Sequence, residues 1–375
     1  MEESKSFSPP YCPNLACRHH KRTHLCKRPF WRRKGFERRK FSEKVQCFQC
    51  KACSRVFSKN TFSLSYRLHK RGHLNARIFF GVVHNRSNRS IARELGVSEC
   101  LVRTRLLRLA RVGLARHASF IEELKIREPI AYDGLECFAR SQYEPNNINQ
   151  AIGVNSLFCY TFNFAPLNRK GRMSSRQRCY LHKLEGKEGR FDPRAIRTST
   201  EALFRELLQK KDPALPKLTL HTDEHFQYRR ALDRDLSPNE RSQIDHVSVS
   251  SKATRNYKNI LFAVNHMDLL SRRYVAAFSR ETICFAKKHS RMIHKYLLFT
   301  CYKNYMKPQF VKAHKSDLRA HTHSPSMILG LTTKLMSFQD FFGQPRPISH
   351  CKNLPSQWQA IANDTVPFQR SFSFC

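Results

Sequence analysis

Apolar residues recur every three to four positions between residues 75 and 117, which is the period of an amphipathic helix. Between residues 128 and 300 the pattern changes, because strand-like runs such as SLFCYTFNF (156–164) alternate with helical runs such as TEALFRELLQKK (200–211). This mixture predicts an α/β domain whose mixed sheet is flanked by helices. The helical pattern of the first region is carried by Ile91, Leu95, Val102, Leu106 and Leu109.

Three other regions lack a clear period. Residues 1–70 are rich in cysteine and basic residues and show little helical patterning. Residues 168–198 are basic and poor in apolar runs, so we expect an exposed insertion within the α/β domain. Residues 309–375 contain much His, Ser, Pro and Phe, and we expect a loosely ordered tail of unknown role.

The charge of the chain identifies a class of partner. The 375 residues include 68 Lys and Arg against 29 Asp and Glu, a formal net charge of +39. A positive charge of this size favours an anionic partner, and nucleic acid gains affinity because bound phosphates release counterions. A ribosomal-type basic protein is the alternative, but the length and the 40% hydrophobic content favour a larger globular protein.

The chain shows no run of about 18 apolar residues, so we expect no membrane span. Its beginning, MEESKSFSPPYCPNLAC, lacks the basic-then-apolar layout of a secretory signal. We therefore expect a cytoplasmic protein whose 14 cysteines are in a reducing compartment. There, closely spaced cysteine pairs favour metal binding over disulfides.

Two cysteine pairs predict a structural zinc site. Cys12 and Cys17 form the first pair, and Cys50 and Cys53 form the second in FQCKACSRVFS. Two such pairs can supply four thiolates to one tetrahedral Zn²⁺, which would stabilise a module too small to fold by apolar burial alone. Cys47 also precedes Cys50 by three residues, so the ligand set can instead include Cys47. Unrelated free cysteines are the alternative.

NRSIARELGVSECLVRTRLLRLAR (88–111) follows the pattern of a helix-turn-helix. Ala92 is small where two helices approach, Gly96 permits a sharp turn, and Ser98 can cap the second helix. Val102 and Leu106 then face inward together. The residues left to contact DNA bases or phosphates are Glu99, Cys100, Arg103 and Arg105. An ordinary amphipathic helical hairpin is the alternative.

Three aspartates stand out because each follows a strand-like or helical pattern in a very basic chain. Asp133 ends the strand-like run EPIAYD, and Asp223 ends KLTLHTD. Asp268 follows Asn265 by three residues in a predicted helix that spans 265–288, so both lie on one helix face. Three converging carboxylates can bind two Mg²⁺ ions about 4 Å apart and promote in-line phosphoryl transfer.

Other acidic residues are weaker candidates for this site. Glu136 lies three residues after Asp133 and is an alternative, whereas Asp192, Asp233 and Asp245 lack comparable strand context. The helix with Asp268 also carries a basic series that we expect to contact the DNA backbone. It comprises Arg272, Arg273, Arg280, Lys287 and Lys288.

At these residues the chain resembles bacterial insertion-sequence transposases of the DDE/DDD type, which have a ribonuclease-H-like catalytic domain. The resemblance covers roughly residues 10–308. It is carried by FQCKACSRVF, SIARELGVSECLVRTRL, YDGLECFARSQYEPNNINQAIG, HTDEHFQYRRAL and NHMDLLSRRYVAAFSRETICFAKK. The last stretch is the most specific, since these transposases carry a similar Asn-His-x-Asp segment followed by Arg-Glu-Thr-x-Cys-Phe.

The resemblance implies that Asp133, Asp223 and Asp268 are the catalytic residues and hold Mg²⁺ or Mn²⁺. Related groups place Glu or Asn at the third position, so Asn265 or His266 remains an alternative to Asp268. It further implies terminal inverted repeats and target DNA as substrates, a homo-oligomer on two DNA ends, and a bacterial, nucleoid-associated location.

The predicted organisation has four parts. A zinc-ribbon-like module (1–70) and a helix-turn-helix (75–117) precede a ribonuclease-H-like domain (128–308), and the tail (309–375) follows. Two other functions fit some of these features. A zinc-ribbon regulator that binds DNA without cutting it leaves the three aspartates unexplained, and a metal-dependent nuclease would cut DNA without joining it.

Overall fold

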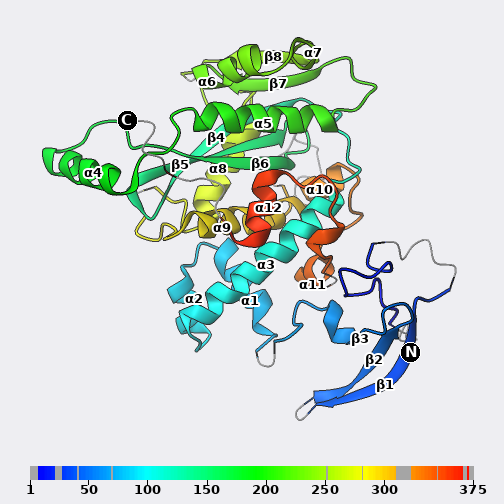
Figure 1. The fold of residues 1–375 in the computed structure, drawn as a ribbon. Helices are drawn as coiled ribbons and strands as arrows, with labels where there is room; N and C mark the ends of the chain where they lie inside the picture. The colour runs from blue at the N-terminus through cyan, green and yellow to red at the C-terminus, as the bar shows by residue number, and fades with distance from the viewer. Residues whose placement is uncertain are drawn as a thin grey trace.

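A small antiparallel sheet and a larger mixed sheet organise the protein (Figure 1). The computed structural model describes residues 7–21, 28–39, 42–68, 71–250, 252–280, 282–309, 322–343, 345–365 and 370. Helices pack against the larger sheet, and the smaller sheet lies near the N-terminus. The chain is therefore a mixed α/β protein with a separate N-terminal module, as the sequence pattern predicts.

The N-terminal module contains three strands in the order β1-β2-β3, namely β1 (Trp31–Arg39), β2 (Ser42–Cys50) and β3 (Val56–Ser58). The second cysteine pair lies in the turn between β2 and β3, as predicted. A small cluster of aromatic rings and cysteines forms its core, with Phe30, Phe48, Phe57 and Phe62 all buried. This core is separate from the main one. The short 3₁₀ helix η2 (Lys59–Phe62) follows β3.

Three helices follow this module, namely α1 (Leu74–Val83), α2 (Asn88–Glu94) and α3 (Glu99–Phe120). The turn between α2 and α3 has the predicted geometry. Gly96 has φ +60°, a conformation that glycine adopts without steric cost. The Ser98 hydroxyl accepts a hydrogen bond from the Leu101 amide at 3.2 Å, which caps α3. Val102 and Leu106 are buried, as predicted.

The larger sheet has the strand order β6-β5-β4-β7-β8. The first three strands along the chain pair antiparallel, whereas β7 joins β4 in parallel and β8 joins β7 in parallel. Consecutive hairpins explain the antiparallel half, and helical crossovers explain the parallel half. The strands are β4 (Ile130–Ala139), β5 (Ser141–Gly153), β6 (Cys159–Pro166), β7 (Leu218–Asp223) and β8 (Ile244–Val249).

Different helices cover the two faces of this sheet. Helix α5 (Ala195–Lys210) lies on one face, where the Tyr132 hydroxyl bonds Thr200 at 2.7 Å. Helices α8 (Phe262–Tyr274) and α9 (His289–Cys301) lie on the other face, and α3 packs against α9. Two short helices, α6 (Phe226–Arg230) and α7 (Pro238–Ser242), lie between β7 and β8. Two short π-helical segments are η3 (Ala231–Asp235) and η4 (Tyr302–Met306).

The helix predicted over 265–288 is shorter than expected, because α8 ends at Tyr274. The next four residues, Val275 to Phe278, are all buried. Four consecutive residues cannot all lie on the buried face of an amphipathic helix. The chain therefore leaves the helix after Tyr274 and enters the core. Arg280, Lys287 and Lys288 therefore lie in the connection to α9 and do not continue the basic series of α8.

The basic segment 168–198 is an exposed insertion, as predicted, but most of it is helical. Helix α4 (Ser175–Glu188) has no buried residue and projects from the sheet at the left of Figure 1. A Ser174–Gln177 capping box starts the helix, and Gly189 ends it with φ +76°. Local capping thus defines a helix that apolar patterning did not reveal.

The prediction of a loosely ordered tail is wrong for much of residues 309–375. The described part contains α10 (Pro325–Ile328), α11 (Phe338–Phe342), the 3₁₀ helix η6 (Ile348–His350) and α12 (Ser356–Asn363). Trp358 is 1% exposed, and its indole donates to the Phe162 carbonyl of β6 at 2.8 Å. The segments are short, so their burial comes from tertiary packing that helical periodicity does not reveal.

A single buried cluster runs from the first helices through the large sheet to α12. Helices α1, α2 and α3 are therefore joined to the sheet by packing. Within the part of the chain that the structure describes, no helix combines the length and apolar content needed to cross a membrane.

We expect Trp358→Ala to lower the free energy of unfolding by about 3–5 kcal/mol, because it removes a buried ring from between β6 and α3. Urea denaturation of the full chain would measure this change. Gln359→Ala, on the exposed side of the same helix, should change it by less than about 1 kcal/mol. Equal effects of the two substitutions would contradict the packed position of α12.

Candidate functional site

Strand pairing places Asp133 beside Asp223. Strands β4 and β7 pair in parallel through Ile130 with Leu220 and Ala131 with His221. The same register continued by two residues aligns Asp133 with Asp223, where ladder pairing has ended. Side chains at one level of neighbouring strands point to the same face, so the two carboxylates share a face of the sheet. Asp223 ends its strand as predicted, whereas Asp133 lies inside a strand that continues to Ala139.

Asp268 reaches the same face from α8. Gln150 of β5 is the antiparallel partner of Asp133, and its side-chain amide donates a hydrogen bond to Asp268 Oδ1. The side-chain carbonyl oxygen of Gln150 accepts a hydrogen bond from the Tyr296 hydroxyl of α9. Gln150 therefore connects the strand that carries Asp133 to the helix that carries Asp268.

The environment of Asp133 opposes its ionisation. Burial raises the pKa of Asp133 to about 6, and the negative charge of Asp223 adds to this increase. The Gly134 amide at 2.7 Å and the Tyr228 hydroxyl at 3.3 Å donate to Asp133 Oδ1 and partly counteract it. The protonated and ionised forms of Asp133 are thus about equally populated near pH 6, well above the ordinary pKa of an aspartate.

Asp268 shows the same effect more strongly. Burial raises its pKa to about 7, and the charge of Asp133 contributes, while Arg272, Gln150 and Arg255 act in the opposite direction. The three aspartates are therefore coupled through Asp133, which is influenced by Asp223 and itself influences Asp268. A bound cation would relieve this mutual repulsion.

The donor set suits a hard divalent cation, because three carboxylates offer only oxygen ligands. The carboxylates are not tightly gathered. Among the described residues, only the four cysteines of the N-terminal module have ligand atoms all within 4.8 Å of one another. The aspartates thus converge on one face without forming a cluster of that compactness.

Several residues around the aspartates were not predicted from the sequence. Gln150 donates to Asp268 and accepts from Tyr296, Tyr228 contacts Asp133, and Arg255 lowers the pKa of both acids. Strand alternation places Gln150 on an inner face, but only the β4–β5 register pairs it with Asp133. Tyr228 follows Asp223 by five residues, and nothing in its local pattern indicates that contact.

The alternative acidic and metal-binding candidates lie elsewhere. Glu136 is exposed, and because it is three positions from Asp133 it points to the opposite face of β4. His266 stacks on Phe262, and burial lowers its pKa to about 4, with Lys303 and Lys307 contributing. Asn265 is half-buried one turn before Asp268, so it remains a candidate on the same helix face.

The four predicted cysteines form a compact cluster. Cys12 and Cys53 sulfurs are 3.6 Å apart, and those of Cys17 and Cys50 are 3.7 Å apart. A tetrahedral zinc ion with Zn–S bonds of about 2.3 Å requires S···S separations of about 3.8 Å. The cluster therefore has the dimensions and ligand chemistry of a structural zinc site.

Cys47 lies outside this cluster, since its thiol contacts the Val45 carbonyl instead. Burial raises the pKa of Cys12 and Cys17. Burial acts in the same direction at Cys53, but hydrogen bonds from the Arg55 amide and Asn14 outweigh it and lower that pKa to about 7. The site thus contains at least one thiol that readily becomes a thiolate.

The start of α3 presents the predicted DNA-facing residues, with one exception. Cys100 and Arg103 are exposed, and half-exposed Glu99 pairs with Arg89 at 3.4 Å. Arg105 is only 6% exposed, so the prediction that it contacts DNA is wrong. Its position lies three residues after Val102, on the face of α3 that packs inward.

The two basic residues at the end of α8 differ in their surroundings. Arg272 is half-buried and donates hydrogen bonds to the carbonyls of Phe278 at 3.3 Å and Glu136 at 3.2 Å. Arg273 is exposed. Arg272 is therefore fixed one helical turn after Asp268, while Arg273 is available at the surface.

The sequence was compared with known families and proteins. No protein-family model matches the chain, and the search of curated proteins found no similar sequence.

We expect Asp268→Asn to stabilise the protein without added divalent cation above about pH 7. The folded state raises the pKa of Asp268 from 3.8 to about 7, so the wild type loses stability as pH rises through this interval. Asn keeps the acceptor for Gln150 but carries no charge. The gain should be on the order of 1–3 kcal/mol and vanish toward pH 4. Urea unfolding across this pH range would measure it, and a pH-independent difference would contradict it.

We expect the purified protein to contain one zinc ion that Cys50→Ser removes, because three thiolates leave the tetrahedral site incomplete. Elemental analysis would measure the zinc content, and unfolding of the aromatic N-terminal core should accompany its loss. Cys47→Ser is the matched control and should keep the metal. Equal zinc contents in both variants would contradict this ligand set.

Proposed function

We propose that this chain is a DNA transposase of the DDE/DDD type, in which Asp133, Asp223 and Asp268 hold two Mg²⁺ or Mn²⁺ ions. The observation that carries this proposal is the meeting of three aspartates, from two strands and a helix, on one face of the sheet. Burial and mutual repulsion raise the pKa of Asp133 and Asp268, an arrangement that has little structural benefit without a cation.

The sheet supports this proposal. Three antiparallel strands followed by two parallel strands, with Asp133 on the central strand, are compatible with the ribonuclease-H-like domain that the sequence resemblance implies. The first carboxylate lies on the middle strand, the second at the end of its parallel neighbour, and the third on a helix that packs on both β4 and β5. The scaffold is rigid where the reacting groups must be aligned.

In the proposed reaction, the bound divalent ions would stabilise the charge on the attacking and leaving oxygens. Water attacks a phosphorus atom at the transposon end, the P–O3′ bond breaks, and the DNA strand keeps a 3′-hydroxyl. That hydroxyl then attacks a phosphorus of target DNA and displaces a second 3′-oxygen. Asp133 and Asp223 would hold the ions from the sheet, while Gln150 fixes the orientation of Asp268.

The N-terminal parts would provide DNA recognition. Cys100 and Arg103 are exposed at the start of α3, and we propose that they face the DNA groove as in a helix-turn-helix. The four-cysteine module would add contacts through its basic hairpin, whose β1 contains WRRKGFERR. We propose that together they bind the terminal repeats as part of a homo-oligomer, with Zn²⁺ holding the module in shape.

A DNA cleavage assay tests the catalytic assignment. We expect the purified chain to cut a duplex that carries the ends of the DNA flanking its reading frame, only when Mg²⁺ or Mn²⁺ is present. Asp133→Asn and Asp223→Asn should each lower the rate by at least about a thousandfold, because each removes charge needed by both ions. Gel electrophoresis of labelled strands would follow cleavage and joining.

Controls in the same assay separate the competing functions. Glu136→Gln, on the opposite face of β4, should cut normally, and the aspartate variants should bind DNA as tightly as the wild type. Binding without any cleavage would favour a regulator, and cleavage without joined product would favour a nuclease. Normal cutting by both aspartate variants would eliminate the proposed site.

A further inference from the structure

Helix α4 is an unusual element, because it is well formed yet buries none of its 14 residues. A helix that is polar on every side gains little from packing, and a helix of this length is marginal in isolation. Its shape is instead held at its ends, by the Ser174–Gln177 capping box and by ion pairs of Glu188 with Arg140 at 2.9 Å and Glu185 with Arg190 at 3.4 Å.

The charge of this segment is strongly one-sided. Between Arg169 and Arg190 the chain has eight Lys and Arg against two Glu, and both Glu residues are already paired with arginines. Six of the cations are exposed, and none of them forms an ion pair with any described residue. They are Lys170, Arg172, Arg176, Arg178, Lys183 and Lys187.

The exposed residues make an ordered stripe along α4. Arg176, Tyr180, Lys183 and Lys187 follow each other at three-to-four spacing and share one face. Lys183 and Lys187 are like charges four apart, an arrangement that disfavours an isolated helix. Beside the stripe is a hollow of about 630 Å³, where the ring of 54% exposed Tyr180 packs on Tyr143 at 4.9 Å.

A cleft connects the segment before α4 with the end of α8. Three arginines, Arg169, Arg272 and Arg280, line this cleft of about 580 Å³ together with one acidic residue, Glu136. Arg272 lies one helical turn after Asp268.

We propose that α4 is an arm that binds the sugar-phosphate backbone of duplex DNA leaving the catalytic face. The inference deepens the proposed function and rests on it for the identity of the nucleic acid. A row of unpaired cations on a capped helix complements a row of phosphates, and the cleft with its three arginines extends that positive surface to Arg272, one helical turn after Asp268. The contact carries no base information, because phosphates are the same at every step.

The salt dependence of DNA binding tests this arm. The triple variant Arg176→Gln, Lys183→Gln and Lys187→Gln should reduce the slope of log Kobs against log salt concentration by about 2–3, since each lost phosphate contact removes about 0.9. The measurement uses fluorescence anisotropy of a labelled duplex of arbitrary sequence. Lys183→Arg with Lys187→Arg should keep the wild-type slope.

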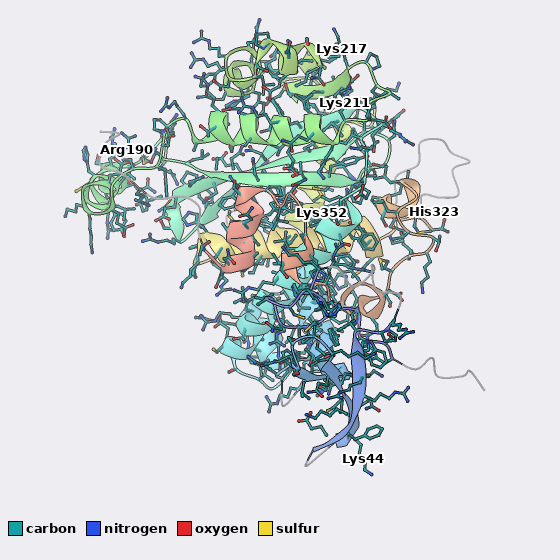
Figure 2. The ribbon with its side chains drawn as sticks, turned by 45° about the vertical axis from the view of Figure 1, so that its right-hand side comes forward. Lys44, Arg190, Lys211, Lys217, His323 and Lys352 are labelled. Carbon is teal, nitrogen blue, oxygen red and sulfur yellow. The ribbon has the colours of Figure 1, made fainter. Side chains whose placement is uncertain are left out.

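A matched control removes the same charge elsewhere. Lys217→Gln, Lys334→Gln and Lys352→Gln change three exposed lysines, and Figure 2 shows two of them, Lys217 and Lys352, well away from Arg190 at the base of α4. This variant should keep the wild-type slope to within about 0.5. The unfolding transition of both triple variants should match that of the wild type, because neither set is buried.

The outcomes separate this inference from the proposed function. A slope that falls for the α4 variant and not for the control supports the arm. An unchanged slope, an equal fall in both variants, or a loss confined to single-stranded RNA overturns it, even if Asp133→Asn abolishes cleavage. Conversely, normal cleavage by Asp133→Asn would remove the catalytic proposal, while the slope would still measure the contribution of α4 to DNA binding.

Discussion

The parallel pairing of β4 with β7 is the constraint on which the candidate site depends. Their ladder extends through Ala131 and His221 and stops before Asp133 and Asp223, so the two strands no longer bond each other where the carboxylates meet. The antiparallel neighbour on the other side, β5, keeps its register past this level and supplies Gln150 opposite Asp133. Strand β4 thus has Asp223 on one neighbouring strand and Gln150 on the other, both at the level of Asp133. Asp268 is then held by the amide of Gln150.

The sequence predicts which aspartates form this site better than it predicts the contacts between them and their neighbours. Asp223 could be placed at a strand end, because Leu218, Leu220 and Thr222 alternate before it and are all buried in the structure. The sequence places Asp133 less accurately, because the strand continues after it through GLECFA to Ala139. Contacts of Gln150, Tyr228 and Tyr296 depend on strand register and helix packing, which connect residues more than 90 positions apart.

The same distinction applies to the other parts of the fold. Cysteine spacing predicted the four-cysteine cluster, since close pairs limit the geometry strongly. Apolar period predicted α2 and α3 but misplaced Arg105, whose buried position shows that a long charged side chain can lie on an inward face. The segments after residue 322 have no useful period, because each is short and is held mainly by contacts with α3, α9, η4 or β6.

The packing of α3 has a mechanical consequence. Its 22 residues begin at the surface that would read DNA and end within the core shared with α9 and the sheet. Under the proposed function, the length of α3 sets the distance between the base pairs that are recognised and the bond that is cut. One residue inserted into its middle would advance the reading end by about 1.5 Å and rotate it by about 100°. The spacing between the recognition sequence and the cleavage point would then depend on the length of α3. Substitutions of its surface residues would leave that spacing unchanged.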